Sequence, residues 1–571
     1  MKLLKTVSSQ LKLRFETSEN EIDARIITSA SCLKNEPFSF QILYRSEDKA
    51  LWEKLSVQVE TDLPLQVYRV DQVAIQNTAN LYCGKGYAGD TPGLYPNPLM
   101  PRPSVPELAL MHDQGFYCIQ GTEYYEKDII YTLDGDVNFR SLWVSINPDS
   151  TDMQSGKHEI GIKLFSGHGA KLLEEEVFTL EVIDCNLPEN ETYYTNWFHV
   201  DCLCDFYKVE PYSDEFYKYF ESFVSNAARH RQNMLLIPAF TPPLDTVRGG
   251  ERRNVQLVDV TVTENGYEFG FERLKKFLDT AVKCGIRYFE HCHLFSQWGA
   301  ESAPNIYDVN GERIFGWDTP SNGDEYIGFL NAYLKELIAF VKKNGYEERF
   351  IFHLSDEPSV KHVENFRKMT AGIRDTLKGF KIVDALSNIE FYTEGFVTSP
   401  IPVVYEVEEF LGKCDELWMY YTGAVYKEDY SNRLITITAA RTRVLGLQMY
   451  RYDIKGFLHW AYNFYYNELS KGFFDPLVNP CGYKNYPGAS YRAYPTRDGA
   501  VPSICEKLMC EAFDDIRALK LLESYIGKEK VIALCEEHLG EKITLTTVPE
   551  NDKMFTLRQK INAEIKKYSE V

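Results

Sequence analysis

Two adjacent carboxylates, Asp356 and Glu357, stand in the stretch RFIFHLSDEPSV, residues 349–360. The apolar residues before them predict a strand, and Pro358, which cannot donate a hydrogen bond to a strand ladder, marks its end. Because neighbouring carboxylates repel each other, the less solvated one acquires a higher pKa while the other stays ionised. The pair can therefore supply one proton donor and one anion. An acidic surface pair or a helix N-cap is the alternative that these residues allow.

The spacing of the pair restricts the reactions that it can serve. Ordinary retaining glycosidases hold two carboxyls about 5 to 5.5 Å apart on opposite sides of the scissile bond, and inverting enzymes hold them further apart. Neighbours in the chain cannot flank a glycosidic bond in this way, so a glycosidase built on this pair needs another nucleophile. Glu416, in the segment ELWMYYTG, stands at the beginning of its predicted strand, where it is no substitute.

Short apolar segments alternate with amphipathic helical patterns after about residue 190, which is typical of βα units around a parallel sheet. The strands are predicted in residues 196–203, 233–240, 286–295, 349–355, 381–386, 402–407, 416–421 and 456–462. Eight strands predict a (β/α)8 barrel, with Asp356 and Glu357 at the C-terminal end of the fourth strand, where barrel enzymes carry their active sites.

The chain before residue 185 has a different pattern, with β-forming segments between turn residues and few helical periods. These segments predict a β-sandwich with strands in residues 11–16, 38–45, 63–75, 141–148, 158–166 and 174–183. The Pro-rich residues 91–110 are expected to form a long loop. We therefore expect two domains, an N-terminal β-sandwich of residues 1–185 and a catalytic barrel of residues 186–571 that ends in helices.

Four segments together resemble glycoside hydrolase family 123. They are HLSDEP at 353–358, GFLHWAYNFYY at 456–466, SYRAYPTRDG at 490–499 and DDIRALKLLE at 514–523. The resemblance covers roughly residues 190–525 and implies a retaining, exo-acting β-N-acetylgalactosaminidase with a β-sandwich ahead of its barrel. Its substrate would be a glycan or glycolipid with terminal N-acetylgalactosamine (GalNAc), and it would need no cofactor.

The resemblance also implies the missing nucleophile, which is the oxygen of the sugar's own 2-acetamido group. That oxygen would attack the anomeric carbon and form an oxazolinium intermediate. Glu357 would protonate the leaving oxygen and later activate water, while Asp356 would orient the acetamido N–H and stabilise its positive charge. On this hypothesis the two acids are adjacent because they act on neighbouring parts of one sugar.

Aromatic side chains are expected to contact the apolar faces of the sugar. Trp418, Tyr420 and Trp460 are predicted towards the ends of the seventh and eighth strands, and Trp298 lies in a long loop after the third. Tyr421 competes with Tyr420 as the hydroxyl that bonds the acetamido oxygen. Simple packing between barrel and helices is the alternative for each ring.

Polar residues near other strand ends are further candidates. Asn463 could bond sugar hydroxyls or satisfy turn backbone. His291 and His293, in EHCHLF, could be metal ligands of a metallohydrolase, sugar-hydroxyl ligands or core histidines. Because no HxxxH or HExxH motif accompanies them, we expect no catalytic metal, and His291 and His293 are candidate sugar-hydroxyl ligands or core histidines.

The net charge and the cysteine content limit the binding partners and the cellular location that we expect. A formal net charge of −21 argues against nucleic acid and anionic membrane surfaces as partners. Thirteen scattered cysteines fit reduced thiols, and no signal-peptide core or bilayer-spanning run is present, so we expect a cytoplasmic protein. A secreted chain given without its leader would look the same.

Two other functions remain open from the sequence. They are a β-N-acetylglucosaminidase of the same mechanism and a non-catalytic carbohydrate-binding protein. The sequence gives no indication of the oligomeric state.

Overall fold

The computed structural model describes residues 2–14, 16–45, 55–76, 84–89, 91–101, 109–110, 139–166, 171–425, 429–550 and 552–569. The chain divides into two compact units. The first unit consists of Met1–Asn190, Gly423–Arg451 and Asp475–Val571, and the second consists of Glu191–Thr422 and Tyr452–Phe474.

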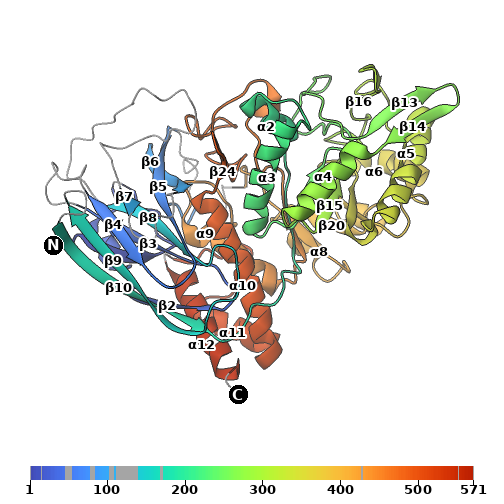
Figure 1. Ribbon diagram of the computed structural model, residues 1–571. Helices are drawn as coiled ribbons and strands as arrows, with labels where there is room; N and C mark the ends of the chain where they lie inside the picture. The colour runs from blue at the N-terminus through green and yellow to red at the C-terminus, as the bar shows by residue number, and fades with distance from the viewer. Residues whose placement is uncertain are drawn as a thin grey trace. The chain divides into compact units, whose positions relative to one another are not determined.

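The first unit contains the predicted β-sandwich (Figure 1). One sheet has the order β1-β3-β8-β5-β6 and the other β2-β10-β9-β4-β7. Inward-facing rings join the sheets, as where Phe40 of β3 stacks on Phe178 of β10 with centroids 4.4 Å apart. The strands are β1 (Leu4–Ser8), β2 (Ser29–Leu33), β3 (Phe38–Tyr44), β4 (Ser56–Glu60), β5 (Leu65–Ile75), β6 (Gly93–Pro101), β7 (Ala109–Leu110), β8 (Arg140–Ile146), β9 (Gly156–Ser166) and β10 (Lys171–Ile183).

Two local predictions in this unit are wrong. Strand β6 replaces part of the loop expected at 91–110, of which residues 102–108 lie outside the described part of the chain. β6 pairs with β5 at the end of its sheet, and its other side makes only an isolated bridge from Pro98 to Ser503 among the described residues. Prolines are tolerated on such an edge because that side of the strand needs few ladder bonds. The described residues of 11–16 follow β1 and lie outside any strand.

The helices of the first unit explain why its grouping differs from the division expected at residue 185. Val444, Leu519 and Ile561, one from each of three helices, share a buried apolar cluster with Leu33 of β2. Residues 423–451 and 475–571 therefore cluster with the N-terminal part of the chain. The helices are α1 (Glu19–Asp23), α9 (Ala439–Arg451), α10 (Ile504–Ile526), α11 (Lys528–Leu539) and α12 (Lys553–Ser569), and a small hairpin is formed by β23 (Tyr494–Thr496) and β24 (Gly499–Val501).

The second unit is built on an eight-stranded parallel barrel, which confirms the predicted fold class. The strand order is β20-β19-β18-β15-β12-β11-β22-β21, and a parallel bridge between Val403 and Tyr420 joins the two ends of this order. The strands are β11 (Tyr193–Asn196), β12 (Met234–Ile237), β15 (Tyr288–His291), β18 (Phe350–His353), β19 (Lys381–Leu386), β20 (Ser399–Pro402), β21 (Trp418–Tyr420) and β22 (Gly456–His459).

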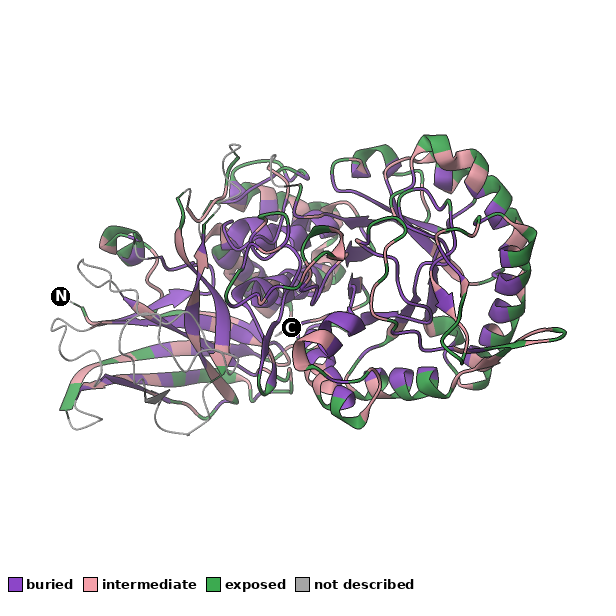
Figure 2. Ribbon diagram, turned by 90° about the horizontal axis from the view of Figure 1, so that it is seen from above, coloured by how far each residue is buried: buried purple, intermediate pink, exposed green. Residues whose placement is uncertain are grey.

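Amphipathic helices surround this barrel, and Figure 2 shows them exposed on their outer sides and buried toward the strands. α5 is typical, with acidic residues in its first turn and lysines in its last, where they complement the helix dipole. The helices are α2 (Val200–Tyr207), α3 (Asp214–Arg229), α4 (Glu272–Lys283), α5 (Asp324–Lys343), α6 (Val363–Ile373), α7 (Glu390–Thr393) and α8 (Val407–Phe410). Hairpins are formed by β13 (Asp259–Thr263) with β14 (Gly266–Gly270) and by β16 (Ile306–Tyr307) with β17 (Arg313–Phe315).

Two barrel strands are shifted from their predicted positions. The strand expected at 196–203 ends at Asn196, and the chain continues into α2. A short apolar segment of this kind is compatible with a buried helix as well as with a strand, so its pattern does not distinguish the two. The strand expected at 402–407 is β20, which ends at Pro402. In the described part of the chain, no helix is both long enough and apolar enough to cross a membrane.

Candidate active site

The adjacent carboxylates lie just beyond the C-terminal end of β18, as the sequence predicts. Asp356 is half-buried and Glu357 is exposed. Glu357 has a left-handed backbone with φ of 49°, which is uncommon for a residue other than glycine. Its N–H donates a 2.9 Å bond to the carbonyl of Ala385 in β19, which helps to hold this conformation. Unusual backbone of this kind is often found where a side chain must be aimed at a substrate.

Tyr420, the last residue of β21, contacts one of the two acids directly. Its hydroxyl donates a 2.8 Å hydrogen bond to Oε1 of Glu357. Burial and the neighbouring charge of Glu357 raise the pKa of Tyr420 well above its usual value. The phenol therefore stays protonated and acts as a donor. The sequence predicts Tyr420 as a candidate donor to the acetamido oxygen of the sugar. Its hydrogen bond to Glu357 was not predicted.

The environments of the two acids differ. Burial raises the pKa of Asp356 well above its usual value, and the charges of Glu357, Asp384 and Asp245 raise it further, while His353 acts in the opposite direction. The half-buried environment of Asp356 therefore favours its protonated form. This asymmetry is the electrostatic arrangement that acid–base chemistry by a carboxyl pair requires.

A buried ionic cluster lies below the pair. Nδ1 of His353 is 2.7 Å from Glu290 Oε1, and Nε2 is 3.7 Å from Asp384 Oδ1. Burial opposes the charge of this imidazole, yet its contacts with Asp384 and Glu290 raise the pKa of His353 to about 10. Glu290 also accepts bonds from Trp197 Nε1 and the hydroxyl of Thr195. The site therefore has a charged floor with all three ionic side chains fully buried.

Asp384 connects this floor to the carboxylate pair. Its Oδ2 accepts 2.9 Å bonds from both the N–H and the hydroxyl of Ser355, the residue immediately before Asp356. Sequence reasoning missed Glu290 and Asp384. Each is an acid inside an otherwise apolar strand segment, YFEH and KIVDAL, which is the signal that could have revealed them.

Aromatic side chains are exposed beside the pair. The backbone N–H of Trp298 donates a 2.7 Å bond to the carbonyl of Asp356, and the Trp298 side chain is 46% exposed. Tyr405, which follows β20 and was not predicted, is 51% exposed and close enough to Tyr420 to raise its pKa. Trp460, directly after β22, is half-buried with its ring against Phe464. Exposed rings near a pair of carboxylates suit the apolar faces of a sugar.

Trp418 lies at the opposite end of the barrel from the carboxylates. It is the first residue of β21 and fully buried, and its ring stacks on Tyr193, the first residue of β11. Its Nε1 donates a 2.8 Å bond to Glu416. The expected sugar contact is therefore corrected to a packing role, because the strand begins at this tryptophan instead of ending near it.

The two histidines of EHCHLF do not act together. His291 is buried, with Nε2 2.8 Å from the Tyr333 hydroxyl of α5 and Nδ1 2.6 Å from the carbonyl of Cys292. Burial lowers the pKa of His291 to about 4. His293 is also fully buried, between Trp197 and His353. Neither is placed as a sugar ligand, and within the described ranges no group of three or more His, Cys, Asp or Glu side chains has an arrangement that could hold a metal ion.

Asn463 and Tyr421 are likewise committed to the protein. The Asn463 amide is buried and clamps the backbone of His199, accepting from its N–H at 2.8 Å and donating to its carbonyl at 3.0 Å. Tyr421 is fully buried with its ring against Phe457 and His459. The alternation of side chains along a strand separates Tyr421 from its neighbour Tyr420.

The chain is similar to known glycoside hydrolases. The model of the glycoside hydrolase 123 catalytic domain matches residues 197–522. A family 123 glycoside hydrolase from Clostridium perfringens, whose structure is described in terms of glycolipid glycan hydrolysis, has a similar fold, with a TM-score of 0.67 and 12% identity, covering 99% of this chain and 98% of that one. A family 39 glycoside hydrolase from Bacteroides cellulosilyticus WH2 matches with a TM-score of 0.32 and 9% identity, covering 86% and 82% of the two chains. No curated protein matches the sequence.

Proposed function

Since the chain belongs to glycoside hydrolase family 123 and is a glycoside hydrolase, we propose that it is a retaining exo-β-N-acetylgalactosaminidase. It removes terminal β-linked GalNAc from glycans or glycolipids, and the 2-acetamido group of the substrate is the nucleophile. The observation that carries this proposal is the adjacency of Asp356 and Glu357 at one strand end of the barrel.

The other carboxylates near the pair are already engaged. Besides Glu357, the acids whose charges raise the pKa of Asp356 are Asp384 and Asp245. Asp384 belongs to the buried ionic cluster, and Asp245 accepts a 2.9 Å bond from the N–H of Leu469. A substrate that brings its own nucleophile removes the need for a further free carboxylate.

Glu357 is the proton donor to the leaving oxygen in this mechanism. It is exposed, so that an aglycone can reach it, and Tyr420 restrains its carboxyl group. After the leaving group departs, the carboxylate of Glu357 accepts a proton from the water that opens the oxazolinium ion. The hydrogen bond from Tyr420 supports the anionic form that this second step needs.

Asp356 stabilises the acetamido group. Its raised pKa means that it holds a proton before substrate binds. An acetamido N–H placed against it favours the carboxylate, because a donated hydrogen bond stabilises the charged form. Substrate binding then shifts the proton of the pair toward Glu357, which arms the general acid only when an acetamido sugar is present.

Two observations support the proposed substrate class. Exposed Trp298 and Tyr405 offer stacking surfaces beside the carboxylates, and the related enzyme from C. perfringens is described as acting on glycolipid glycans.

A thiazoline derived from GalNAc mimics the oxazolinium ion and tests the mechanism. We expect it to inhibit competitively and far more tightly than GalNAc itself. Hydrolysis that is insensitive to this thiazoline would contradict acetamido participation, and stronger inhibition by the N-acetylglucosamine thiazoline would change the sugar assignment.

A further inference from the structure

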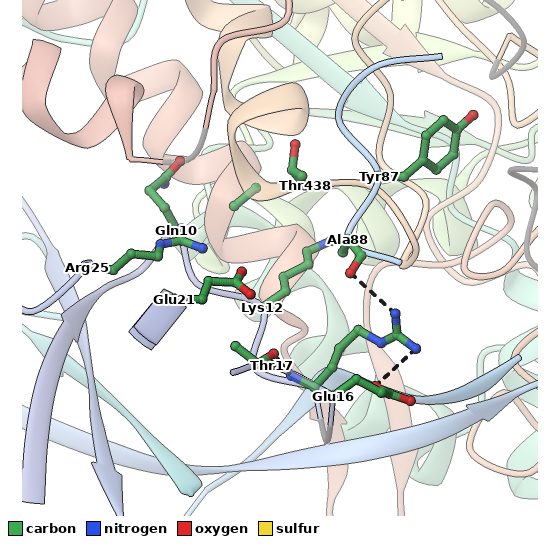
Figure 3. A pocket seen from close by; sticks show the side chains of 11 residues that line it. Gln10, Lys12, Glu16, Thr17, Glu21, Arg25, Tyr87, Ala88 and Thr438 are labelled. Carbon is green, nitrogen blue, oxygen red and sulfur yellow. Dashed lines mark hydrogen bonds and ion pairs between the residues drawn. The ribbon is translucent and has the colours of Figure 1, made fainter. Parts of the chain in front are cut away.

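A polar cavity of about 170 Å³ lies in the first unit, and all of the residues that line it belong to that unit. The N-terminal segment, the loop at 87–88 and the start of α9 line it, and Figure 3 shows Lys12 extending among these elements. A single water needs roughly 10–15 Å³ of such space, so a polyatomic ligand fits. The lining residues are Gln10, Lys12, Arg14, Glu16, Thr17, Glu21, Arg25, Tyr87, Ala88, Thr438 and Ala439.

Lys12 is a buried cation with no anionic partner among the described residues. The residue is 6% exposed, and its Nζ donates a 3.1 Å bond to the carbonyl of Ile435, with Sγ of Cys505 the next contact at 3.8 Å. No carboxylate of the described residues pairs with it. Burial lowers the pKa of Lys12, and the charge of Arg492 adds to this effect while Cys505 opposes it. A buried charge is costly unless a counter-charge compensates it.

Arg14 places a second cation in the cavity wall. It is 7% exposed, and its Nε is buried without a hydrogen-bond partner among the described residues. Its terminal nitrogens make long contacts of 3.4 Å to the Ala88 carbonyl and 3.2 Å to the exposed Glu16. The guanidinium also bonds Thr91 Oγ1 at 3.4 Å and lies over the Tyr95 ring, 4.1 Å from its centroid. An exposed carboxylate, a ring face and neutral oxygens thus take the place of the short paired bonds that a guanidinium normally forms to an anion.

The amino end of α9 adds to the positive potential. Thr438 and Ala439 line the cavity at the start of this thirteen-residue helix, where the positive end of the helix dipole favours an anion. The N–H groups of Thr438 and Arg441 are already bonded, to the Gly86 carbonyl and to Thr438 Oγ1. The acidic side chains in the cavity wall, Glu16 and Glu21, are exposed to solvent. A third wall cation, Arg25, is already paired with Asp552.

We propose that this cavity binds a small tetrahedral oxyanion, a sulfate or a phosphate, either free or as an ester on a sugar. Lys12 and Arg14 hold the charged oxygens. The amide oxygen of Gln10, which is buried and has no hydrogen-bond partner among the described residues, accepts a bond from the hydroxyl of hydrogen phosphate or from a hydroxyl of the sugar in a sugar ester. The site lies outside the catalytic machinery and does not depend on the proposed substrate of the barrel.

Calorimetric titration and thermal unfolding of the full chain test the proposal, with sulfate, phosphate and GalNAc 6-sulfate as probes and chloride at matched ionic strength as the reference. We expect saturable binding and a saturable rise in Tm, which separates site binding from the general salting effect of sulfate. Equal affinity for free sulfate and the sugar sulfate identifies the free ion as sufficient, and tighter binding of the ester identifies a sulfated sugar.

Two variants make the test decisive. Lys12→Met should weaken oxyanion binding at least about tenfold, since a charge-assisted bond is lost, while hydrolysis by the barrel is unchanged. Glu16→Gln removes the carboxylate that competes for Arg14 and should tighten binding, so the proposal remains testable even if Lys12→Met folds poorly. Absence of saturable binding by the wild type, or equal affinities in the wild type and both variants, would overturn it.

Discussion

The hydroxyl of Tyr420 and the carboxylate of Glu357 are joined by a 2.8 Å hydrogen bond that connects the C-terminal ends of β21 and β18. The bond restrains an exposed acid whose backbone is left-handed. It therefore fixes where the proton of the pair can be delivered, and its loss should affect the chemical step more than substrate binding.

Tyr420→Phe keeps the ring and removes this bond. We expect kcat to fall about 10- to 100-fold with KM little changed, since hydrogen bonds to charged groups contribute about 1.5–3 kcal/mol. Tyr421→Phe is the matched control. It makes the same change at the next residue, whose ring packs against Phe457 and His459. Steady-state kinetics of both variants distinguish the cases, and equal rates for the two would remove Tyr420 from the mechanism.

Asp356→Asn should lower kcat about 10²- to 10³-fold, the usual effect of removing an electrostatic stabiliser, and leave the fold intact. Its stability has a defined pH dependence. The raised pKa of Asp356 means that the folded protein loses stability as pH rises above the ordinary value of 3.8. The Asn variant lacks this loss, so it should unfold at a higher temperature than the wild type at neutral pH and at the same temperature below pH 3.8. A variant that is less stable at neutral pH would show that Asp356 is ionised there.

His353 should stabilise the fold in the opposite pH window. A pKa raised to about 10, against an ordinary 6.5, gives a contribution that is complete below pH 6.5 and is lost as pH rises toward 10. His353→Gln leaves Glu290 and Asp384 buried without their cation, which should cost about 3–5 kcal/mol at pH 7. Denaturant unfolding at several pH values measures the difference from the wild type. A gap that stays constant up to pH 10 would mean that the imidazole is neutral.

Two tryptophans separate binding from packing. Trp298→Ala removes a 46% exposed ring beside Asp356 and should raise KM with Tm unchanged. Trp418→Ala opens a cavity at the buried start of β21 and should cost about 3–5 kcal/mol of stability. Any reduction in the activity of this variant should follow the folded fraction. A pure KM effect at Trp418 would restore it to the sugar site.

The sequence was informative where one residue type and its place in a strand determine the outcome. Pro358 and the apolar residues before Asp356 located the carboxylates at a strand end, and alternating segments revealed the barrel. Positions that depend on the exact start of a strand were not predictable. Trp418 is two residues from Tyr420, which contacts Glu357, yet a strand that begins at Trp418 puts it at the opposite end of the barrel from the carboxylates.

Sequence patterns also could not predict contacts between side chains that lie on strands far apart in the sequence. The cluster of His353, Glu290 and Asp384 depends on three strands meeting in the barrel. Asn463 is held by the backbone of His199, more than 260 residues away in sequence. Local composition alone suggests a sugar ligand at such a polar residue, because it cannot reveal that the hydrogen bonds are already used.

The measurement that tests the account most directly compares p-nitrophenyl β-N-acetylgalactosaminide with the corresponding β-galactoside, using wild type and Glu357→Gln. We predict that the wild type hydrolyses only the acetamido sugar, that chelator has no effect, and that Glu357→Gln lowers kcat about 10²- to 10⁴-fold. Equal hydrolysis of both sugars by the wild type would contradict the acetamido nucleophile, and undiminished activity of Glu357→Gln would contradict its role as the acid.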